Sequence, residues 1–426
     1  MIRILTAILL ALPVLAQAQA PGQADAKYIV TFRAGTPQAQ RADVVRRAGA
    51  ALRFNYSIVD AVAISVANSN ALAALRNEPS VLSIVPDHAV SAFQNGDGIE
   101  ANAKGTSSGT GTPGQTIPEG VKRVGLPATG SDGSGIGVAI VDSGIDLVNA
   151  DLRQNIYPDS FASPSFGTTC QDDNSHGTHV AGIVGAVDNQ TGTLGVAPKA
   201  TLYCVKVLNA SGSGSDSDVI AGLDWVAQRT AIRVVNMSLG RDASANPSDD
   251  DPMHNAVRSL YNFGITVVVA AGNEPTKDVS KMVPAGFPEV LAVASTTAVD
   301  GTNACRWLSA AIKADTASYF TTDGSGVTVS APGEDKENVS KGCLISSSGI
   351  LSTKLGGGTT RMSGTSMASP HVAGVVARFL QQGDLTPDQV RTAVQNAAQG
   401  KGMVPWNSPA SSYTFDAVRE GIAHAP

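Results

Sequence analysis

The chain has little of several features that would point at once to a class of function. Charged residues make up only 15% of its 426 positions and aromatic residues 5%, and acidic side chains outnumber Lys and Arg by 36 to 30. The resulting formal charge of −6 argues against nucleic acid as the main partner, because phosphate binding needs a basic surface. A hydrophobic content of 42% still allows a sizeable core, which excludes a disordered or fibrous chain.

Long apolar segments are also lacking. The first twenty residues carry Arg3, a short apolar stretch over 4–15, and the small-residue site Ala18-Gln19-Ala20, which is typical of an export signal. That stretch is too short for a membrane anchor, which takes about 20 residues, and no later segment is long and apolar enough. We therefore expect a secreted protein, extracellular or periplasmic, with no membrane partner.

Cysteine is scarce as well. In an exported protein the four cysteines are expected to be oxidised, and four allow three connectivities. Sequential pairing is our working prediction, which joins Cys170 to Cys204 and Cys305 to Cys343.

The length and the composition divide the chain into four parts. A chain of 426 residues exceeds the size at which one core stops growing, roughly 250 to 300 residues. After the predicted signal (1–20), residues 21–93 contain a β-α-β-β-α-β pattern typical of a small ferredoxin-like α+β domain. Residues 94–114 are rich in Gly, Ser and Thr, as in a flexible linker, and 115–426 form the large domain.

Within the large domain, apolar strand patterns alternate with segments of helical period. The strands are predicted around 137–142, 201–208, 234–240, 266–273, 290–296 and 327–332. This alternation predicts an α/β fold, with a mostly parallel sheet and helices on both faces. Ligands bind beyond the carboxyl ends of such strands, where the pattern places Asp142, Ser238 and Asn273.

Three residue types needed for nucleophilic catalysis occur in the order Asp, His, Ser. Asp142 ends the strand VAIVD, a position where an Asp is more often a helix cap or a turn former. His176 and Ser366 open similar small-residue helices, where the helix dipole favours negative charge beside a serine oxygen. A serine needs a base to take its proton, and a histidine base needs a carboxylate to orient it.

Five motifs extend this order into a family resemblance. The stretches VAIVDSGID, NSHGTHVAG, VVNMSLG, VVVAAGNE and GTSMASPHVAG together resemble the subtilisin-like serine proteases. The resemblance implies a subtilisin-like fold and a secreted serine endopeptidase that acts through an acyl-enzyme. By the same resemblance Asp142 orients His176, His176 is the general base and then acid, Ser366 is the nucleophile, and Asn273 holds the oxyanion.

The resemblance also indicates how a substrate would bind. It places polypeptide substrates as a strand between Ser238-Leu239-Gly240 and Gly212-Ser213-Gly214, a mode that is indifferent to side chains. The segment 274–282 departs from the usual Gly- and Ser-rich loop, with Met282 near a position that is usually glycine. We therefore expect a narrowed pocket for P1, the residue before the cleaved bond.

Calcium and self-processing are implied in the same way. The family's strong calcium site matches Gln115, Asp151, Val187, Asn189, Thr191 and Thr193, whose oxygen ligands suit a hard cation. A polar loop without metal is the alternative. The 21–93 unit resembles an inhibitory propeptide that assists folding, and we expect a monomeric zymogen cut after Phe93 or elsewhere up to Gly114, in one or two steps.

Other interpretations remain for some motifs. HGTH (176–179) has the wrong spacing and no Glu for a HExxH zinc site, and the glycines of DGSGIG precede their strand, unlike those of a dinucleotide loop. A protein that keeps the fold but is an inactive binding or inhibitory module is the alternative function.

Overall fold

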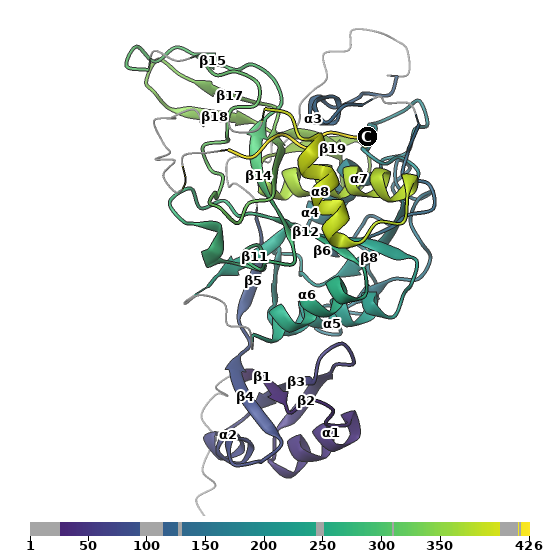
Figure 1. The fold of residues 1–426 in the computed structure, drawn as a ribbon, viewed down its shortest axis with the longest axis vertical. Helices are drawn as coiled ribbons and strands as arrows, with labels where there is room; N and C mark the ends of the chain where they lie inside the picture. Colours follow the sequence, from purple (N-terminus) through teal and green to yellow (C-terminus); the bar gives the residue numbers. More distant parts are fainter. Residues whose placement is uncertain are drawn as a thin grey trace, which may run out of the picture.

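The computed structural model describes residues 26–93, 114–126, 130–243, 251–308, 311–400, 416 and 419–426. The predicted signal and most of the predicted linker lie outside these residues. In the described part, a small N-terminal unit lies against one end of a larger α/β body (Figure 1).

The small unit has the predicted order of elements. Its sheet runs β2-β3-β1-β4, with helices α1 and α2 packed on it. The elements are β1 (Ala26–Phe32), α1 (Gln38–Arg47), β2 (Ala51–Asn55), β3 (Ala61–Val66), α2 (Ser69–Arg76) and β4 (Val81–Pro86). A short strand, β5 (Ala89–Ala92), then leaves this unit and pairs with the larger body.

A seven-stranded parallel sheet forms the centre of the larger body, which confirms the predicted fold class. Its order is β16-β14-β12-β10-β6-β8-β7. The strands are β6 (Gly137–Asp142), β7 (Phe161–Ala162), β8 (Thr201–Lys206), β10 (Ile232–Met237), β12 (Thr266–Ala270), β14 (Leu291–Thr297) and β16 (Val329–Glu334). The two-residue edge strand β7 was not expected from the sequence.

Helices cover both faces of this sheet. In β6, Val138 and Ile140 join the core under α4 and α7, whereas Ala139 and Val141 join the core under α5 and α6. Strands buried on both faces explain the continuous apolar runs in the sequence. The helices are α3 (Glu119–Arg123), α4 (His176–Gly185), α5 (Asp216–Ala227), α6 (Pro252–Asn262), α7 (Thr365–Gln382) and α8 (Pro387–Ala397).

Smaller sheets surround the central one. The sheet β13-β11-β5-β9 contains β9 (Ser213–Ser215), β11 (Leu239–Asp242) and β13 (Met282–Val283). Two further groups are β15 (Thr302–Asn303) with β17 (Lys336–Val339) and β18 (Ile345–Ser348), and the hairpin β19 (Ile350–Thr353) and β20 (Thr359–Met362). The cysteines are joined sequentially, Cys170 to Cys204 and Cys305 to Cys343, and the second bridge lies in the core beside β17 and β18.

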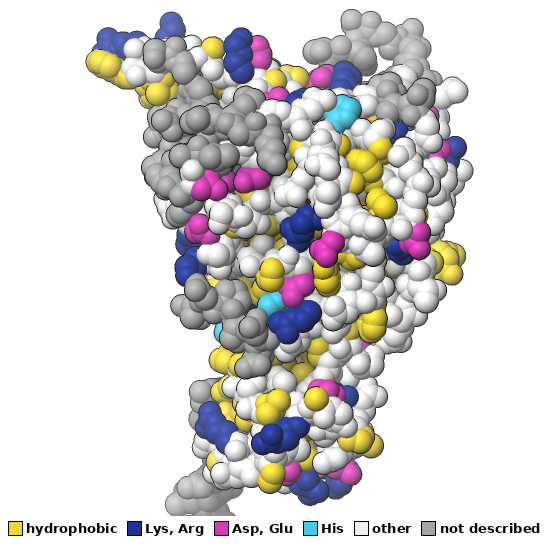
Figure 2. Space-filling view, viewed as in Figure 1, with side chains coloured by type: hydrophobic (Ala, Val, Ile, Leu, Met, Phe, Trp, Pro, Cys, Tyr) yellow, Lys and Arg dark blue, Asp and Glu magenta, His cyan; other side chains and the backbone are white. Residues whose placement is uncertain are grey.

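The surface reflects the low charge content. Figure 2 shows acidic and basic side chains scattered singly or in small groups over the visible face, among neutral and apolar atoms. None of the described helices is both long enough and apolar enough to cross a membrane.

Candidate active site

The three residues singled out from the sequence meet at one edge of the parallel sheet. Asp142 ends β6, His176 begins α4, and Ser366 is the second residue of α7; all three side chains are fully buried. Parallel strands bring their carboxyl ends to one edge, so sequence positions more than 200 apart converge there.

A close contact links the carboxylate and the imidazole. His176 Nδ1 lies 2.8 Å from Asp142 Oδ1 and 3.0 Å from Oδ2. With Nδ1–H donating to the carboxylate, Nε2 is left with its lone pair free to accept a proton. Among the described residues, His176 Nε2 has no hydrogen-bond partner.

The Ser366 hydroxyl is turned away from this nitrogen. Its Oγ donates to the Ser238 carbonyl oxygen at 3.0 Å. No hydrogen bond joins the Ser366 hydroxyl to His176 Nε2, and hydrogen bonds of this kind often tighten only during the reaction.

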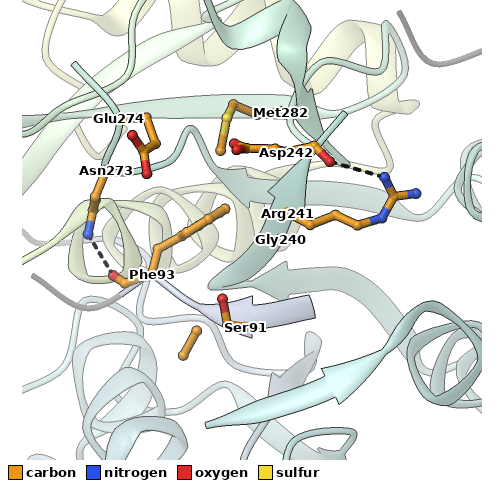
Figure 3. A pocket seen from close by; sticks show the side chains of 9 residues that line it. Ser91, Phe93, Gly240, Arg241, Asp242, Asn273, Glu274 and Met282 are labelled. Atoms are coloured by element: carbon orange, nitrogen blue, oxygen red, sulfur yellow. Dashed lines mark hydrogen bonds between the residues drawn. The ribbon is translucent and has the colours of Figure 1, made fainter. Parts of the chain in front are cut away.

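Asn273 faces a peptide carbonyl. Its Nδ2 donates to the Phe93 carbonyl oxygen at 3.0 Å (Figure 3), while its Oδ1 accepts from Thr365 N at 3.0 Å and from Thr365 Oγ1 at 2.9 Å. Thr365 supplies only donors to this oxygen, so it fixes which end of the Asn273 amide faces Phe93. The role of Thr365 was missed, although it belongs to the GTSMASP motif.

The predicted substrate strands hold the segment before Phe93. In β5, Ala92 and Ser91 pair with Leu239 and Gly240 of β11, while Ser91 and Val90 pair with Ser213 and Gly214 of β9. Phe93 N donates to the Ser238 carbonyl at 3.3 Å, and Ala92 N donates to the Gly212 carbonyl at 3.0 Å. The structure thus brings together all six residues that the sequence predicted for the substrate strands.

A cavity of about 400 Å³ lies beside Phe93 and is also lined by Gly240, Glu274 and Met282 (Figure 3). A Cβ on Gly240 would come 2.6 Å from Phe93 Cζ, so the ring lies directly on that glycine. Met282 lines this cavity, as expected from the sequence, and the narrowing of the P1 pocket stays a prediction. The end of its side chain also packs against Gly272, where an added Cβ would lie 2.7 Å from Met282 Cε.

The second histidine of HGTH has a structural place. His179 is fully buried, and its Nε2 donates to the Ile350 carbonyl at 3.0 Å. Burial first, and repulsion from His176 second, lower the pKa of His179 to about 3. No cluster of three or more His, Cys, Asp or Glu side chains arranged to hold a metal occurs in the described ranges.

The predicted calcium ligands lie together away from the cleft. Asp151 accepts from Asn189 Nδ2 at 3.1 Å and from Thr193 N at 2.8 Å, and Gln115 Nε2 contacts the Val187 and Thr193 carbonyls at 2.6 and 2.9 Å. The remaining residue of the set, Thr191, donates to Asn189 Oδ1. Burial raises the pKa of Asp151, which shows a carboxylate short of positive partners.

Comparisons with known proteins agree with this arrangement. Residues 133–415 match the model of the subtilase family. Subtilisin E of Bacillus subtilis (strain 168) is 32% identical over 406 residues, which cover 91% of each chain, and M-protease of Shouchella clausii (strain KSM-K16) is 37% identical over 68% of this chain and 67% of its own.

Solved structures give the same result. A cold adapted subtilisin-like serine proteinase aligns with a TM-score of 0.56 at 30% identity, over 72% of this chain and 98% of its own. Fervidolysin from Fervidobacterium pennivorans, a keratinolytic enzyme related to subtilisin, aligns with a TM-score of 0.67 at 22% identity, over 96% of this chain and 61% of its own, which supports the fold. These relatives favour an active protease over an inactive module. The chain belongs to the subtilase family and is a subtilisin-like serine endopeptidase.

Proposed function

We propose that this endopeptidase is made as an exported zymogen whose N-terminal unit blocks the cleft and is removed by Ser366 after Phe93. The single observation that carries the proposal is the hydrogen bond from Asn273 Nδ2 to the Phe93 carbonyl oxygen. A carbonyl held by an amide donor next to a serine is the geometry of a bond about to be attacked.

The proposed chemistry follows from the three buried side chains. His176 Nε2 takes the proton of Ser366 as Oγ attacks the Phe93 carbonyl carbon, and Asp142 stabilises the imidazolium that results. Asn273 Nδ2 and the Ser366 backbone N–H stabilise the tetrahedral oxyanion. His176 then gives the proton to the leaving amine, and water hydrolyses the acyl-enzyme by the same route.

The N-terminal unit has the contacts expected of an intramolecular inhibitor. Besides the pairing of β5, two sets of hydrogen bonds join the unit to helix α5. Asp87 accepts from Ser217 N at 2.9 Å and caps the start of α5. Asp224 of α5 accepts from the N–H groups of Ser57 and Ile58 at 2.8 and 2.6 Å. These polar contacts fix the unit over helix α5 and keep β5 in the cleft. Polypeptide substrates would bind in place of β5 once the unit is released.

We also propose a structural calcium ion at the Asp151 cluster. The donor set fits a hard cation, with one carboxylate, two carbonyl oxygens and two amide side chains that can present oxygen after a flip. The raised pKa of Asp151 supports this fit, because a cation would stabilise the charged carboxylate. The ion would tie residue 115 and the 187–193 loop to the body.

Calcium removal gives a direct test. A chelator should lower the melting temperature of the Ser366→Ala precursor, which cannot digest itself, and added Ca²⁺ should restore it. Asp151→Asn should remove this calcium dependence, while Asp188→Asn, in the same loop but outside the set, should retain it. If the chelator lowered the melting temperature of both variants equally, the ion would lie elsewhere.

The zymogen proposal is tested by intact-mass measurement. Wild-type protein should lose its N-terminal unit and give a new terminus at Gln94, followed by any trimming of the 94–114 segment. Ser366→Ala should stay full length and resist a fluorophosphonate label, since both need the nucleophile. Ser363→Ala, three residues earlier in the chain, is the matched control and should mature.

Maturation of isolated Ser366→Ala would show that another nucleophile or another protease removes the unit. Cleavage at a site other than Phe93–Gln94 would keep self-processing and reject only this bond. Secretion of the protein into the medium tests the proposed export signal. The mass of the same preparation in solution tests whether the enzyme is a monomer.

A further inference from the structure

Two buried polar residues beside the proposed triad have no part in the mechanism above. Ser143 follows Asp142 directly, and Asp172 precedes His176 by four residues; their exposed fractions are 0% and 3%. Burying such groups destabilises a fold unless their polar atoms are hydrogen-bonded, and both side chains are.

The Asp172 carboxylate accepts hydrogen bonds from several residues of the turn before helix α4. Its Oδ1 accepts from Ser143 Oγ at 2.9 Å, Asn174 N at 2.9 Å and Ser175 N at 3.1 Å. Its Oδ2 accepts from Thr178 N at 3.0 Å and Thr178 Oγ1 at 2.5 Å. Five donors on one carboxylate make a strong, charge-assisted network.

That turn is strained immediately before the imidazole. Ser175 has φ 95°, in the left-handed region that a residue with a Cβ rarely adopts. Such a conformation is energetically unfavourable and persists only when its surroundings enforce it. The bond from Ser175 N to Asp172 supplies part of that enforcement, so the direction in which α4 presents His176 depends on Asp172.

Ser143 connects this turn to the end of strand β6, and all three of its polar groups are hydrogen-bonded. Its N–H donates to Asp142 Oδ1 at 2.6 Å, and its Oγ accepts from Gly177 N at 2.9 Å. Its carbonyl accepts from the buried ammonium of Lys206 at 2.5 Å. One residue therefore contacts the proposed triad carboxylate and the first turn of the helix that carries the proposed base.

We propose that Ser143 and Asp172 form a clasp that positions the Asp142 carboxylate against the His176 imidazole. The clasp joins a strand end to a helix start, two segments whose relative shift would otherwise lengthen the 2.8 Å contact between Oδ1 and Nδ1. Neither residue touches the substrate, so both are positioning residues. The inference rests on the proposed roles of Asp142 and His176.

The clasp predicts a loss in turnover without a loss in substrate binding. Asp172→Asn keeps the volume but turns an NH₂ group toward backbone donors, and kcat should fall about 100-fold, as for a small misplacement of catalytic groups. Ser143→Ala removes one hydroxyl and should cost about 10-fold in kcat. KM should stay within about twofold, because β9 and β11 are untouched.

The matched control is Asp146→Asn. Asp146 is equally buried and accepts from Val148 N at 3.3 Å, Gln171 Nε2 at 3.3 Å and Gly356 N at 2.9 Å, but its carboxylate has no hydrogen bond to the 172–178 turn itself. Its substitution should lower the melting temperature with little change in kcat. Each variant can be matured in trans by a trace of wild-type enzyme, so slow self-processing does not prevent the measurement.

A second readout needs neither activity nor maturation. In the Ser366→Ala precursor the His176 Nδ1 proton should give a far-downfield ¹H resonance, which Asp172→Asn and Ser143→Ala should shift or broaden and Asp146→Asn should not. Wild-type kcat and an unchanged resonance in Asp172→Asn would overturn the clasp, as would an equal kcat loss in Asp146→Asn. Full activity of His176→Ala would instead overturn the proposed triad, and the clasp with it.

Discussion

Helices α4 and α7 begin in the same cleft, but their first turns are held in different ways. Before α4, the non-glycine Ser175 takes φ 95° and is fixed by the Asp172 carboxylate. Before α7, Gly364 takes φ 151°, and an added Cβ there would lie 2.5 Å from the Phe93 carbonyl oxygen. The turn before α4 is held by a charged side chain, whereas the turn before α7 is possible because glycine has no side chain.

The difference follows from the charge that develops at each place. In the proposed mechanism the imidazole beside α4 becomes positive, so buried carboxylates nearby are favourable. Beside α7 the proposed oxyanion would form, and the groups hydrogen-bonded to the Asn273 side chain are neutral: Thr365 N, Thr365 Oγ1 and the Phe93 carbonyl. A carboxylate there would raise the energy of the transition state.

The largest expected effect comes from removing the donor on the α7 side. Asn273→Ala should lower kcat by about 10² to 10³ with little change in KM, because the donor acts on the oxyanion more than on the bound carbonyl. Asn273→Asp should lose more, since it adds negative charge where the oxyanion forms. Steady-state kinetics on a peptide substrate measures both.

Thr365→Val is the matched variant for this prediction. It keeps the shape but deletes the hydroxyl that donates to Asn273 Oδ1, so the loss in kcat should be smaller, about 10-fold. A loss as large for Thr365→Val as for Asn273→Ala would mean that Thr365 does more than orient the amide. No loss for Asn273→Ala would remove Asn273 from the oxyanion site.

Most of the fold could be predicted from the sequence, because strands buried on both faces carry continuous apolar runs. All six expected strands of the large domain occur, from β6 to β16, and so does the element order of the small unit. The edge strand β7 has only two residues, Phe161 and Ala162, too few for a pattern. The direction of the Met282 side chain depends on the space left at Gly272, which is a tertiary property.

From the sequence, only those site residues could be predicted that lie in a recognisable motif and have a side chain suited to the proposed chemistry. Asp142, His176, Ser366 and Asn273 lie in motifs whose chemistry can be argued from residue type. Ser143 lies in VAIVDSGID and Asp172 lies two residues before NSHGTHVAG, but a polar residue in a turn is usually a local cap. Their importance depends on contacts between positions 29 and 34 residues apart, which only the folded chain shows.

Behind the first turn of α7 lies a pair of buried acids that extends the comparison to stability. Glu334 ends β16 next to Gly333, whose carbonyl accepts from Gly364 N at 3.0 Å. Burial raises the pKa of Glu334 to about 7, which nearby Ser347 and Ser318 offset only in part. Burial first, and repulsion from Glu334 second, raise the pKa of Glu337 to about 8.

Per pH unit, this pair gives the smallest expected effect, a dependence of stability on pH. A folded-state pKa above the usual 4.5 means that the folded protein favours the protonated acid, so the contribution is complete below pH 4.5 and is lost as pH rises through 7 to 8. The unfolding free energy of the Ser366→Ala precursor should fall between pH 5 and 8 by on the order of 1 kcal/mol per pH unit for each group.

Urea unfolding at several pH values measures how steeply this free energy falls with pH. The slope should be shallower for Glu334→Gln and unchanged for Ser143→Ala. Equal slopes in all three proteins would mean that Glu334 is charged in the folded state, and that the first turn of α7, like that of α4, lies against buried negative charge.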